Sequence, residues 1–124
     1  MTSVRERSQI GEIDVADKQK FLVFSNPVEG REDDYNQWYD DVHLGDVCRV
    51  PGVVGAQRYD LVNTSGDDGP LPTHRYLAVY DLARDVAPAD VLGELAARFG
   101  SPEMAASDAL DLATIAMTVW CPRP

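Results

Sequence analysis

The sequence predicts an α+β domain of the ferredoxin-like type, in which a four-stranded antiparallel sheet carries two helices on one face. Three observations support this prediction. Apolar runs and amphipathic stretches follow one another in the order β-α-β-β-α-β. A loop rich in glycine, proline and aspartate joins the two middle strands, which favours an antiparallel pair. The second helix has one clear apolar face. This order of elements is that of the split βαβ motif.

Length and composition are those of one ordinary globular domain. The chain has 124 residues, of which 44% are hydrophobic and 26% are charged. We expect the polar residues 1–18 to form a flexible N-terminal extension and residues 19–124 to form a single domain. The beginning of the chain lacks the apolar stretch of a secretory signal, and no run approaches the ~18 apolar residues of a membrane span. We therefore predict a cytoplasmic protein without membrane association.

The first strand and the first helix are predicted from one continuous stretch. Residues 20–26, KFLVFSN, form a short apolar run that ends at Asn26-Pro27. Acidic residues then crowd the first turn of a helix, where they favour the positive end of the helix dipole. The apolar stripe of this helix is built from residues at three- and four-residue steps. These residues are Tyr35, Trp38, Tyr39 and Val42. His43 lies at the edge of the stripe, and Pro51-Gly52 ends the segment.

The remaining elements follow from alternation and from helical periodicity. Residues 53–61 and 74–82 are rich in residues that favour strands, and the loop between them is long for a hairpin. Residues 88–99 form a helix with Pro88 in its first turn and Gly100 after its end. We expect one further helical turn within residues 101–112 and a last strand at residues 114–121.

Both faces of the predicted sheet are apolar. Two helices cover one face, and alternating sets such as Phe21/Val23 against Leu22/Phe24 place apolar side chains on the other face as well. Covering several hundred Å² of such a face would contribute on the order of 10 kcal/mol, before opposing terms. A second copy of the same sheet is the simplest cover, so we expect a homodimer that associates through its sheet faces.

Residues 24–61 contain an ordered series of short motifs. In this sequence they are Asn26-Pro27, Gly30-Arg31-Glu32-Asp33, Trp38-Tyr39, His43-Leu44, Val50-Pro51-Gly52 and Gln57-Arg58. The segment resembles the dimeric α/β-barrel superfamily, in particular its EthD-like and uncharacterised bacterial branches. The resemblance implies a dimeric α/β barrel with a pocket between the helices and the sheet. One departure is Gly45, where proline is expected after His-Leu, and it makes the turn after His43 more flexible.

The residues around His43 are the candidate catalytic group. Imidazole exchanges protons near neutrality, and Asp40, three residues earlier, is placed to accept a ring N–H and fix the tautomer. Tyr39 would donate a hydrogen bond to a substrate oxygen, and Tyr35 and Trp38 would supply apolar walls. The resemblance implies that further polar side chains of the first three strands face the pocket. These are Asn26, Gln57, Arg58, Tyr76 and Tyr80.

These residues lead to one hypothesis and two alternatives. The hypothesis is a cofactor-independent enzyme of small-molecule metabolism, of the EthD-like lyase, cyclase, isomerase or monooxygenase kinds that the resemblance implies. It would act on an apolar, oxygen-bearing metabolite through acid/base chemistry at His43. One alternative is a non-catalytic dimeric ligand-binding module, in which Trp38 and Tyr39 are core residues and His43 only favours the helix dipole. The other is a haem-binding protein, because histidine ligates iron in some members of the superfamily.

Other classes of function are disfavoured by composition and motifs. A formal net charge of −10 repels nucleic acid and anionic membrane surfaces. The sequence has no GxSxG motif and no GxGxxG motif, which argues against a serine hydrolase of that kind and against a dinucleotide cofactor. Two cysteines and two histidines without ligand-type spacing indicate free thiols and no metal site.

Overall fold

The structure is a computed structural model that describes residues 19–62 and 73–124, so the expectations for residues 1–18 and for most of the loop before residue 74 lie outside the described residues. The described elements keep the predicted order and confirm the ferredoxin-like α+β class. They are β1 (Gln19–Pro27), α2 (Glu32–Trp38), the π-helical turn η1 (Tyr39–His43), α3 (Leu44–Cys48), β2 (Val53–Asp60), β3 (Tyr76–Leu82), α4 (Pro88–Arg98) and β4 (Leu110–Trp120).

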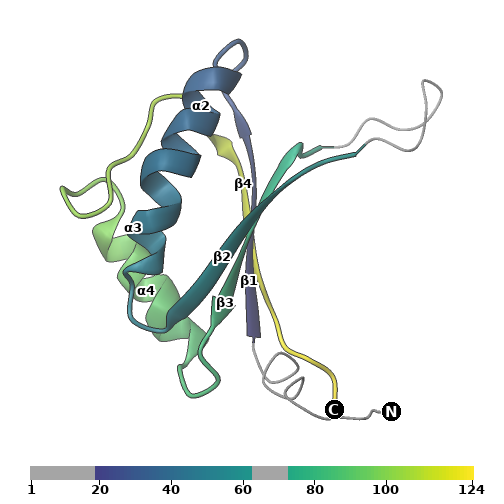
Figure 1. Cartoon of the computed structure of the whole chain (residues 1–124), viewed down its shortest axis with the longest axis vertical. Coiled ribbons are helices and arrows are strands. Elements are labelled where there is room, and N and C mark those ends of the chain that lie inside the picture. Colours follow the sequence, from purple (N-terminus) through teal and green to yellow (C-terminus); the bar gives the residue numbers. More distant parts are fainter. Residues whose placement is uncertain (1–18, 63–72) are drawn as a thin grey trace.

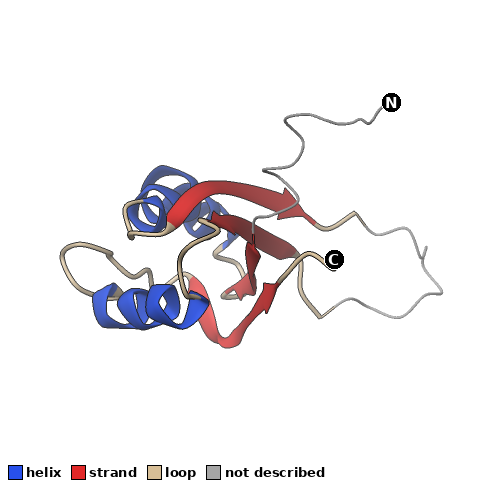
Figure 2. Cartoon of the chain, turned by 90° about the horizontal axis from the view of Figure 1, so that it is seen from below, coloured by secondary structure: helices blue, strands red, loops and turns tan. Residues whose placement is uncertain are grey.

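The sheet has the strand order β2-β3-β1-β4, and the paired strands are antiparallel. The described helices lie on one face of the sheet, and none of them covers the other face (Figures 1 and 2). In the register of the sheet, Phe21 pairs with Tyr80 on one side and with Val119 on the other. Because directly opposite residues in an antiparallel pair point to the same face, this register defines the two faces.

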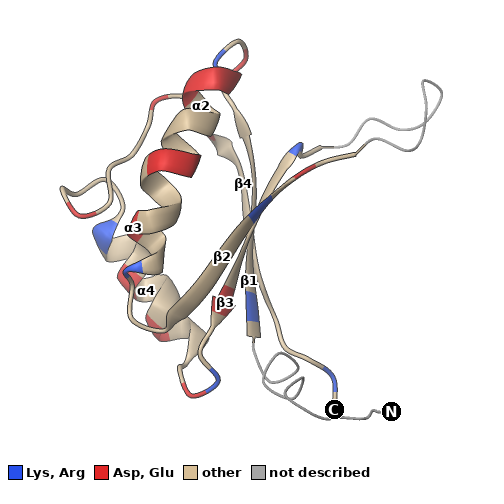
Figure 3. Cartoon of the chain, viewed as in Figure 1, with Lys and Arg blue, Asp and Glu red and all other residues tan. Residues whose placement is uncertain are grey.

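The inner face, which the helices cover, and the outer face carry the predicted sets of side chains. Phe21 and Tyr80 belong to the buried core on the inner face, and their rings stack with centroids 5.6 Å apart. The outer face carries the pairs Leu22 with Val79 and Phe24 with Leu77. Acidic side chains are concentrated on the helices and the turns, and most of the length of the strands is uncharged (Figure 3). Both faces of the sheet are therefore largely apolar, as the alternation predicts.

The first helix is one continuous run of α2, η1 and α3, interrupted by a wider turn in the middle. The backbone N–H of Leu44 donates to the carbonyl of Tyr39, five residues earlier, which is the hydrogen bond of a π-helical turn. The wider turn rotates the residues that follow it relative to an ideal α-helix. Val42, predicted on the apolar stripe, is 38% exposed for this reason, whereas Val47 is buried. The prediction for Val42 is therefore wrong.

The expected helical turn within residues 101–112 is found only as one short hydrogen-bonded turn. A single turn is present, in which the N–H of Met104 donates to the carbonyl of Ser101 at 3.0 Å, and it does not continue as a helix. Strand β4 begins at Leu110, four residues before the predicted strand, because Leu110 pairs with Pro27 at the end of β1. Pairing with a neighbouring strand thus outweighs the local helix propensity of this alanine-rich segment.

Gly52, in the turn between α3 and β2, is a position where a side chain is expected to destabilise the fold. Its φ is +98°, and an added Cβ would lie 2.7 Å from Cγ2 of Val86 and 3.1 Å from Cγ2 of Val91. We expect Gly52→Ala to lower the free energy of unfolding by about 1–3 kcal/mol or more in urea denaturation. The matched control is Gly45→Ala in α3, where the nearest atom would be 3.8 Å away, and we expect it to raise stability by up to about 1 kcal/mol. Wild-type stability in Gly52→Ala would contradict this account of the turn.

Candidate functional site

A cavity of about 520 Å³ lies between the helices and the inner face of the sheet, within the size range of small-molecule sites. Its lining is mostly apolar. The lining residues are Phe21, Val23, Ser25, Trp38, Tyr39, His43, Val47, Tyr80, Leu92, Leu95, Ala96, Phe99, Met104, Leu110, Leu112, Ile115 and Met117. Leu112 and Met117, on the edge strand β4, are 64% and 58% exposed, whereas Tyr80 is 1% exposed. The cavity thus has an open end beside β4 and a buried end beneath η1.

The π-helical turn sets the position of His43 in this cavity. In an α-helix, residues five apart lie about 140° apart around the axis, so Trp38 and His43 would not meet. In the wider turn their rings stack, with centroids 4.5 Å apart and an angle of 18° between the planes. The edges of Tyr39 and Phe99 also approach the imidazole, at 5.0 and 5.9 Å between centroids. Aromatic rings therefore hold the plane of the imidazole, and π-bulges of this kind are frequent at functional sites.

Burial keeps His43 neutral at physiological pH. Burial lowers the pKa of His43 from 6.5 to about 4; the carboxylate of Asp46 acts in the opposite direction, and the cation of Arg58 lowers the pKa further. The Nδ1 atom of His43 is buried and has no hydrogen-bond partner among the described residues. His43 lines the cavity, so a ligand there can reach its imidazole. Without a partner on Nδ1, the ligand itself selects the tautomer.

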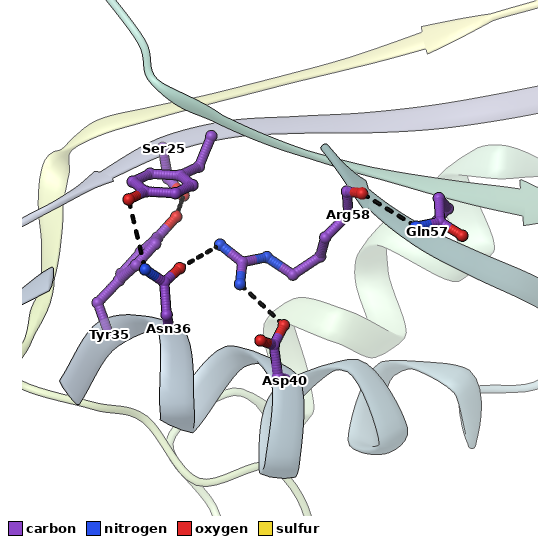
Figure 4. A network of polar contacts seen from close by, with 7 residues as sticks. Ser25, Tyr35, Asn36, Asp40, Gln57 and Arg58 are labelled. Atoms are coloured by element: carbon purple, nitrogen blue, oxygen red, sulfur yellow. Dashed lines mark hydrogen bonds and ion pairs between the residues drawn. The ribbon is translucent and has the colours of Figure 1, made fainter. Parts of the chain in front are cut away.

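Asp40 does not orient His43, so the predicted role of this carboxylate is corrected. Its Oδ1 accepts a hydrogen bond from Nη1 of Arg58 at 2.9 Å, and the side chain points towards β2 (Figure 4). Residues 40 and 43 both lie within the π-helical turn, whose wider winding changes the spacing that brings i and i+3 side chains together in an α-helix. The carboxylate that acts on the pKa of His43 is that of Asp46, three residues later in α3.

Arg58 connects β2 to the first helix and does not line the cavity. Its guanidinium donates to Asp40 and, at 2.9 Å, to Oδ1 of Asn36 (Figure 4). It also lies 4.3 Å from the ring centroid of Tyr39. A cation at this distance over an aromatic ring is attracted to it. Arg58 thus supports the wall residue Tyr39 from behind, which differs from its expected place in the pocket.

Three hydroxyl-bearing side chains lie at the buried end of the cavity: Ser25, Tyr39 and Tyr80. Oγ of Ser25 is 2.6 Å from the hydroxyl of Tyr35, which lies behind the cavity wall. Burial raises the pKa of Tyr39 to about 12, against smaller opposing effects that include the hydroxyls of Tyr80 and Ser25. Burial also raises the pKa of Tyr80. Both phenols are therefore protonated at neutral pH and can donate hydrogen bonds.

Several other predicted site residues lie outside the cavity. The side-chain amide of Asn26 donates to the carbonyl of Thr73 and accepts from the N–H of Arg75, so it fastens the end of β1 to the segment before β3. Gln57 pairs with Val79, and this register places it on the outer face. The hydroxyl of Tyr76 accepts a hydrogen bond from Asn36 at 3.3 Å. Of the predicted site residues, the cavity brings together Trp38, Tyr39, His43 and Tyr80.

The sequence offered signals for some lining residues that were not predicted. Ser25 continues the alternating series Phe21, Val23, Ser25 along β1. The alternation of side chains in a strand therefore indicated a polar residue on the same face as Phe21. Leu92, Leu95 and Phe99 belong to the apolar face of α4. Met104 lies in a segment predicted as a helical turn, and no periodic signal placed it at the cavity.

The residues around the cavity do not fit a haem group or a metal ion. No Lys or Arg lines the cavity, although the two carboxylates of haem favour cationic partners. In residues 19–62 and 73–124, no three His, Cys, Asp or Glu side chains are grouped as metal ligands, and Cys48 and Cys121 are exposed free thiols. The same ranges contain no helix with the length and apolar character needed to cross a bilayer.

Comparisons with known proteins yielded one similarity in structure. No protein-family model matches the chain, and no curated protein sequence matches it. Among solved structures, the chain is similar to an EthD family protein from Bacillus halodurans, with a TM-score of 0.46 and 8% sequence identity. The similar region covers 82% of this chain and 95% of the other. The likeness concerns the fold alone.

Proposed function

We propose that the protein is a cofactor-independent enzyme of small-molecule metabolism that acts on an uncharged, largely apolar, oxygen-bearing substrate. The observation that carries the proposal is a neutral histidine that is held by aromatic rings and lines an apolar cavity. Neutral imidazole is the form that accepts a proton, and a mostly apolar lining of this volume suits a small hydrocarbon skeleton. Removal of a proton from the carbon next to a carbonyl group can start a dehydration, a cyclisation, an isomerisation or a reaction with oxygen.

The low pKa of His43 defines what the substrate must supply. A base with a pKa of about 4 removes a carbon-bound proton only if negative charge develops close to the ring at the same time. An oxyanion near the imidazole raises the affinity of the ring for the proton, because opposite charges then face each other in an apolar cavity. The substrate oxygen therefore has to lie beside His43 and the hydroxyls of the buried end.

The experiment that tests the proposal is hydrogen–deuterium exchange at carbon. We expect the protein to accelerate exchange of the protons next to the carbonyl of α-tetralone in D₂O, followed by proton NMR. In each cycle Nε2 of His43 removes a proton to give the enolate, the imidazolium exchanges with D₂O, and a deuteron returns to carbon. Heat-denatured protein at the same concentration is the control. Exchange no faster than in this control, for a panel of cyclic ketones that bind in the cavity, would contradict catalysis.

One observation favours the ligand-binding alternative. Catalytic histidines are generally oriented by a hydrogen bond on the second ring nitrogen, and Nδ1 of His43 has no such partner among the described residues. A protein that binds α-tetralone and leaves the exchange rate of its protons unchanged would be a ligand-binding module. The exchange experiment and a binding titration on the same sample therefore separate the two functions.

We further propose that two copies associate through the outer faces of their sheets. Trp120 and Tyr59 on this face are 58% and 47% exposed, and Leu22 and Phe24 lie on the same face. We expect a dimer in sedimentation velocity at micromolar concentration, because an apolar sheet face without a cover is unfavourable in water. Leu22→Glu is expected to give a monomer with an unchanged circular dichroism spectrum. Val28→Glu, at an exposed valine in the turn after β1, is the control that stays dimeric. A monomeric wild-type protein would contradict the dimer.

A further inference from the structure

The buried end of the cavity differs from the rest of its lining because hydroxyl groups converge there from separate elements. Ser25 comes from β1, Tyr39 from η1 and Tyr80 from β3, and each is at most 3% exposed. All three side chains line the same cavity and are buried. Apolar side chains of α4 and β4, such as Leu95 and Ile115, line the remaining walls.

The hydroxyl of Tyr80 lacks a hydrogen-bond partner. It is buried, and no described residue offers it a donor or an acceptor within hydrogen-bond geometry. Buried polar groups are nearly always hydrogen-bonded, so an exception beside a cavity indicates a group that a ligand or a water molecule completes. Ser25, by contrast, is already engaged with Tyr35. Tyr80 is therefore the hydroxyl of this cluster with an unused hydrogen-bonding capacity.

The chemistry of the buried end favours an uncharged oxygen. None of the lining residues is Asp, Glu, Lys or Arg, so an ionised ligand group would be buried without an opposite charge. Protonated phenols are donors, and a ligand that approaches them must supply an acceptor. A carbonyl oxygen fits this requirement, because it accepts two hydrogen bonds and carries no formal charge.

We propose that Tyr80, together with Tyr39, forms a hydrogen-bond donor site for one uncharged carbonyl oxygen at the buried end of the cavity. Ser25 holds the cluster to Tyr35, and the hydrocarbon part of the ligand extends from this site towards α4 and β4. Tyr80 is thus a specificity-determining residue that selects ketones and related carbonyl compounds over hydrocarbons of the same shape. The proposal rests on the proposed function only in taking the cavity as the place where the substrate binds.

A pair of probes tests this site without turnover. α-Tetralone and tetralin share one bicyclic skeleton and differ in the carbonyl oxygen. We expect the wild-type protein to bind α-tetralone at least about fivefold more tightly than tetralin in NMR titrations, from the net value of one or two hydrogen bonds. In Tyr80→Phe the affinity for tetralin is expected to stay within twofold, and the preference for the ketone is expected to disappear.

Tyr76→Phe is the matched control, because Tyr76 lies on the same strand but its hydroxyl is bonded to Asn36 outside the cavity. This variant is expected to keep the ketone preference. An unchanged preference in Tyr80→Phe, or no binding of either probe by the folded wild-type protein below millimolar concentration, would overturn the proposal. A ketone preference that depends on Tyr80, combined with no exchange of protons, would refute the enzymatic function and leave this site standing.

Discussion

Replacing His43 with glutamine is expected to lower kcat/KM for carbon-bound proton exchange by a factor of about 10² to 10⁴, the usual contribution of a positioned acid or base. Glutamine retains polar atoms near those of the imidazole ring and cannot accept a proton at neutral pH. The fold is expected to persist, because the ring of His43 lies at the cavity and not within the packed core. A variant with the wild-type rate would contradict the assignment of His43 as the base.

The pH dependence of the same reaction gives a second signature of His43. The pKa in the free enzyme controls kcat/KM, and burial sets it at about 4. We therefore expect kcat/KM to stay constant from pH 8 down to about pH 5 and to fall only near pH 4. A fall centred near the ordinary histidine value of about 6.5 would show that the ring is solvated.

The free energy of unfolding is also expected to depend on pH through His43. In the unfolded chain His43 binds a proton at about pH 6.5, whereas in the folded protein it does so only near pH 4, so the unfolded state binds more protons between these values. The free energy of unfolding therefore decreases as the pH falls through this window, by up to about 3 kcal/mol from this residue. His43→Gln removes this component. His74→Gln, at the other histidine, is the control that retains it.

Replacing Trp38 with alanine is expected to lower the free energy of unfolding by about 3–5 kcal/mol in urea denaturation. Trp38 is 9% exposed, belongs to the core cluster, and its Nε1 donates to the carbonyl of Ala105 at 3.0 Å. Truncation removes a large buried surface and leaves this carbonyl without its partner. It also opens one side of His43 to water, so the pKa of His43 is expected to rise towards 6.5, which proton NMR of the imidazole signals measures.

Trp38→Phe separates the two effects of this substitution. Phenylalanine keeps a flat ring against the imidazole and loses the hydrogen bond to Ala105, so we expect a loss of only about 1–2 kcal/mol. The pKa of His43 is expected to stay low in this variant. If Trp38→Ala were as stable as Trp38→Phe, the tryptophan would not be a structural support of the cavity.

The fold class and the places of Trp38, Tyr39 and His43 at the cavity could be predicted because they depend on periodicity. Tyr80 was expected there only from the family resemblance. Alternation in residues 20–26 separated the inner face from the outer face, and helical spacing placed Trp38 and Tyr39 towards the core. Contacts between side chains of different elements were not predicted. Asp40 was assigned to His43 by sequence spacing, but a strand from elsewhere in the chain supplies Arg58, which forms an ion pair with Asp40. Periodicity does not contain that information.

The π-helical turn is the second feature that local patterns did not reveal. Its cause is tertiary: Trp38 packs against the core and donates to Ala105, while Val47 and Val50, later in the chain, are also buried. One wide turn accommodates both sets of buried residues in a single helix. Val42 was misplaced because the apolar stripe was extrapolated with a constant angle per residue across this turn.

Because of the wide turn, the position of His43 at the cavity depends on the number of residues in this helix. A π-bulge corresponds to one inserted residue in an otherwise regular α-helix. Deleting one residue between Trp38 and His43 would restore the regular winding and leave the two side chains four residues apart, on one face of the helix. A helix of the present length with regular winding would instead place them about 140° apart around the axis. In an alignment of related chains, a gap of one position here would therefore mark a regular helix in which the tryptophan and the histidine still share one face.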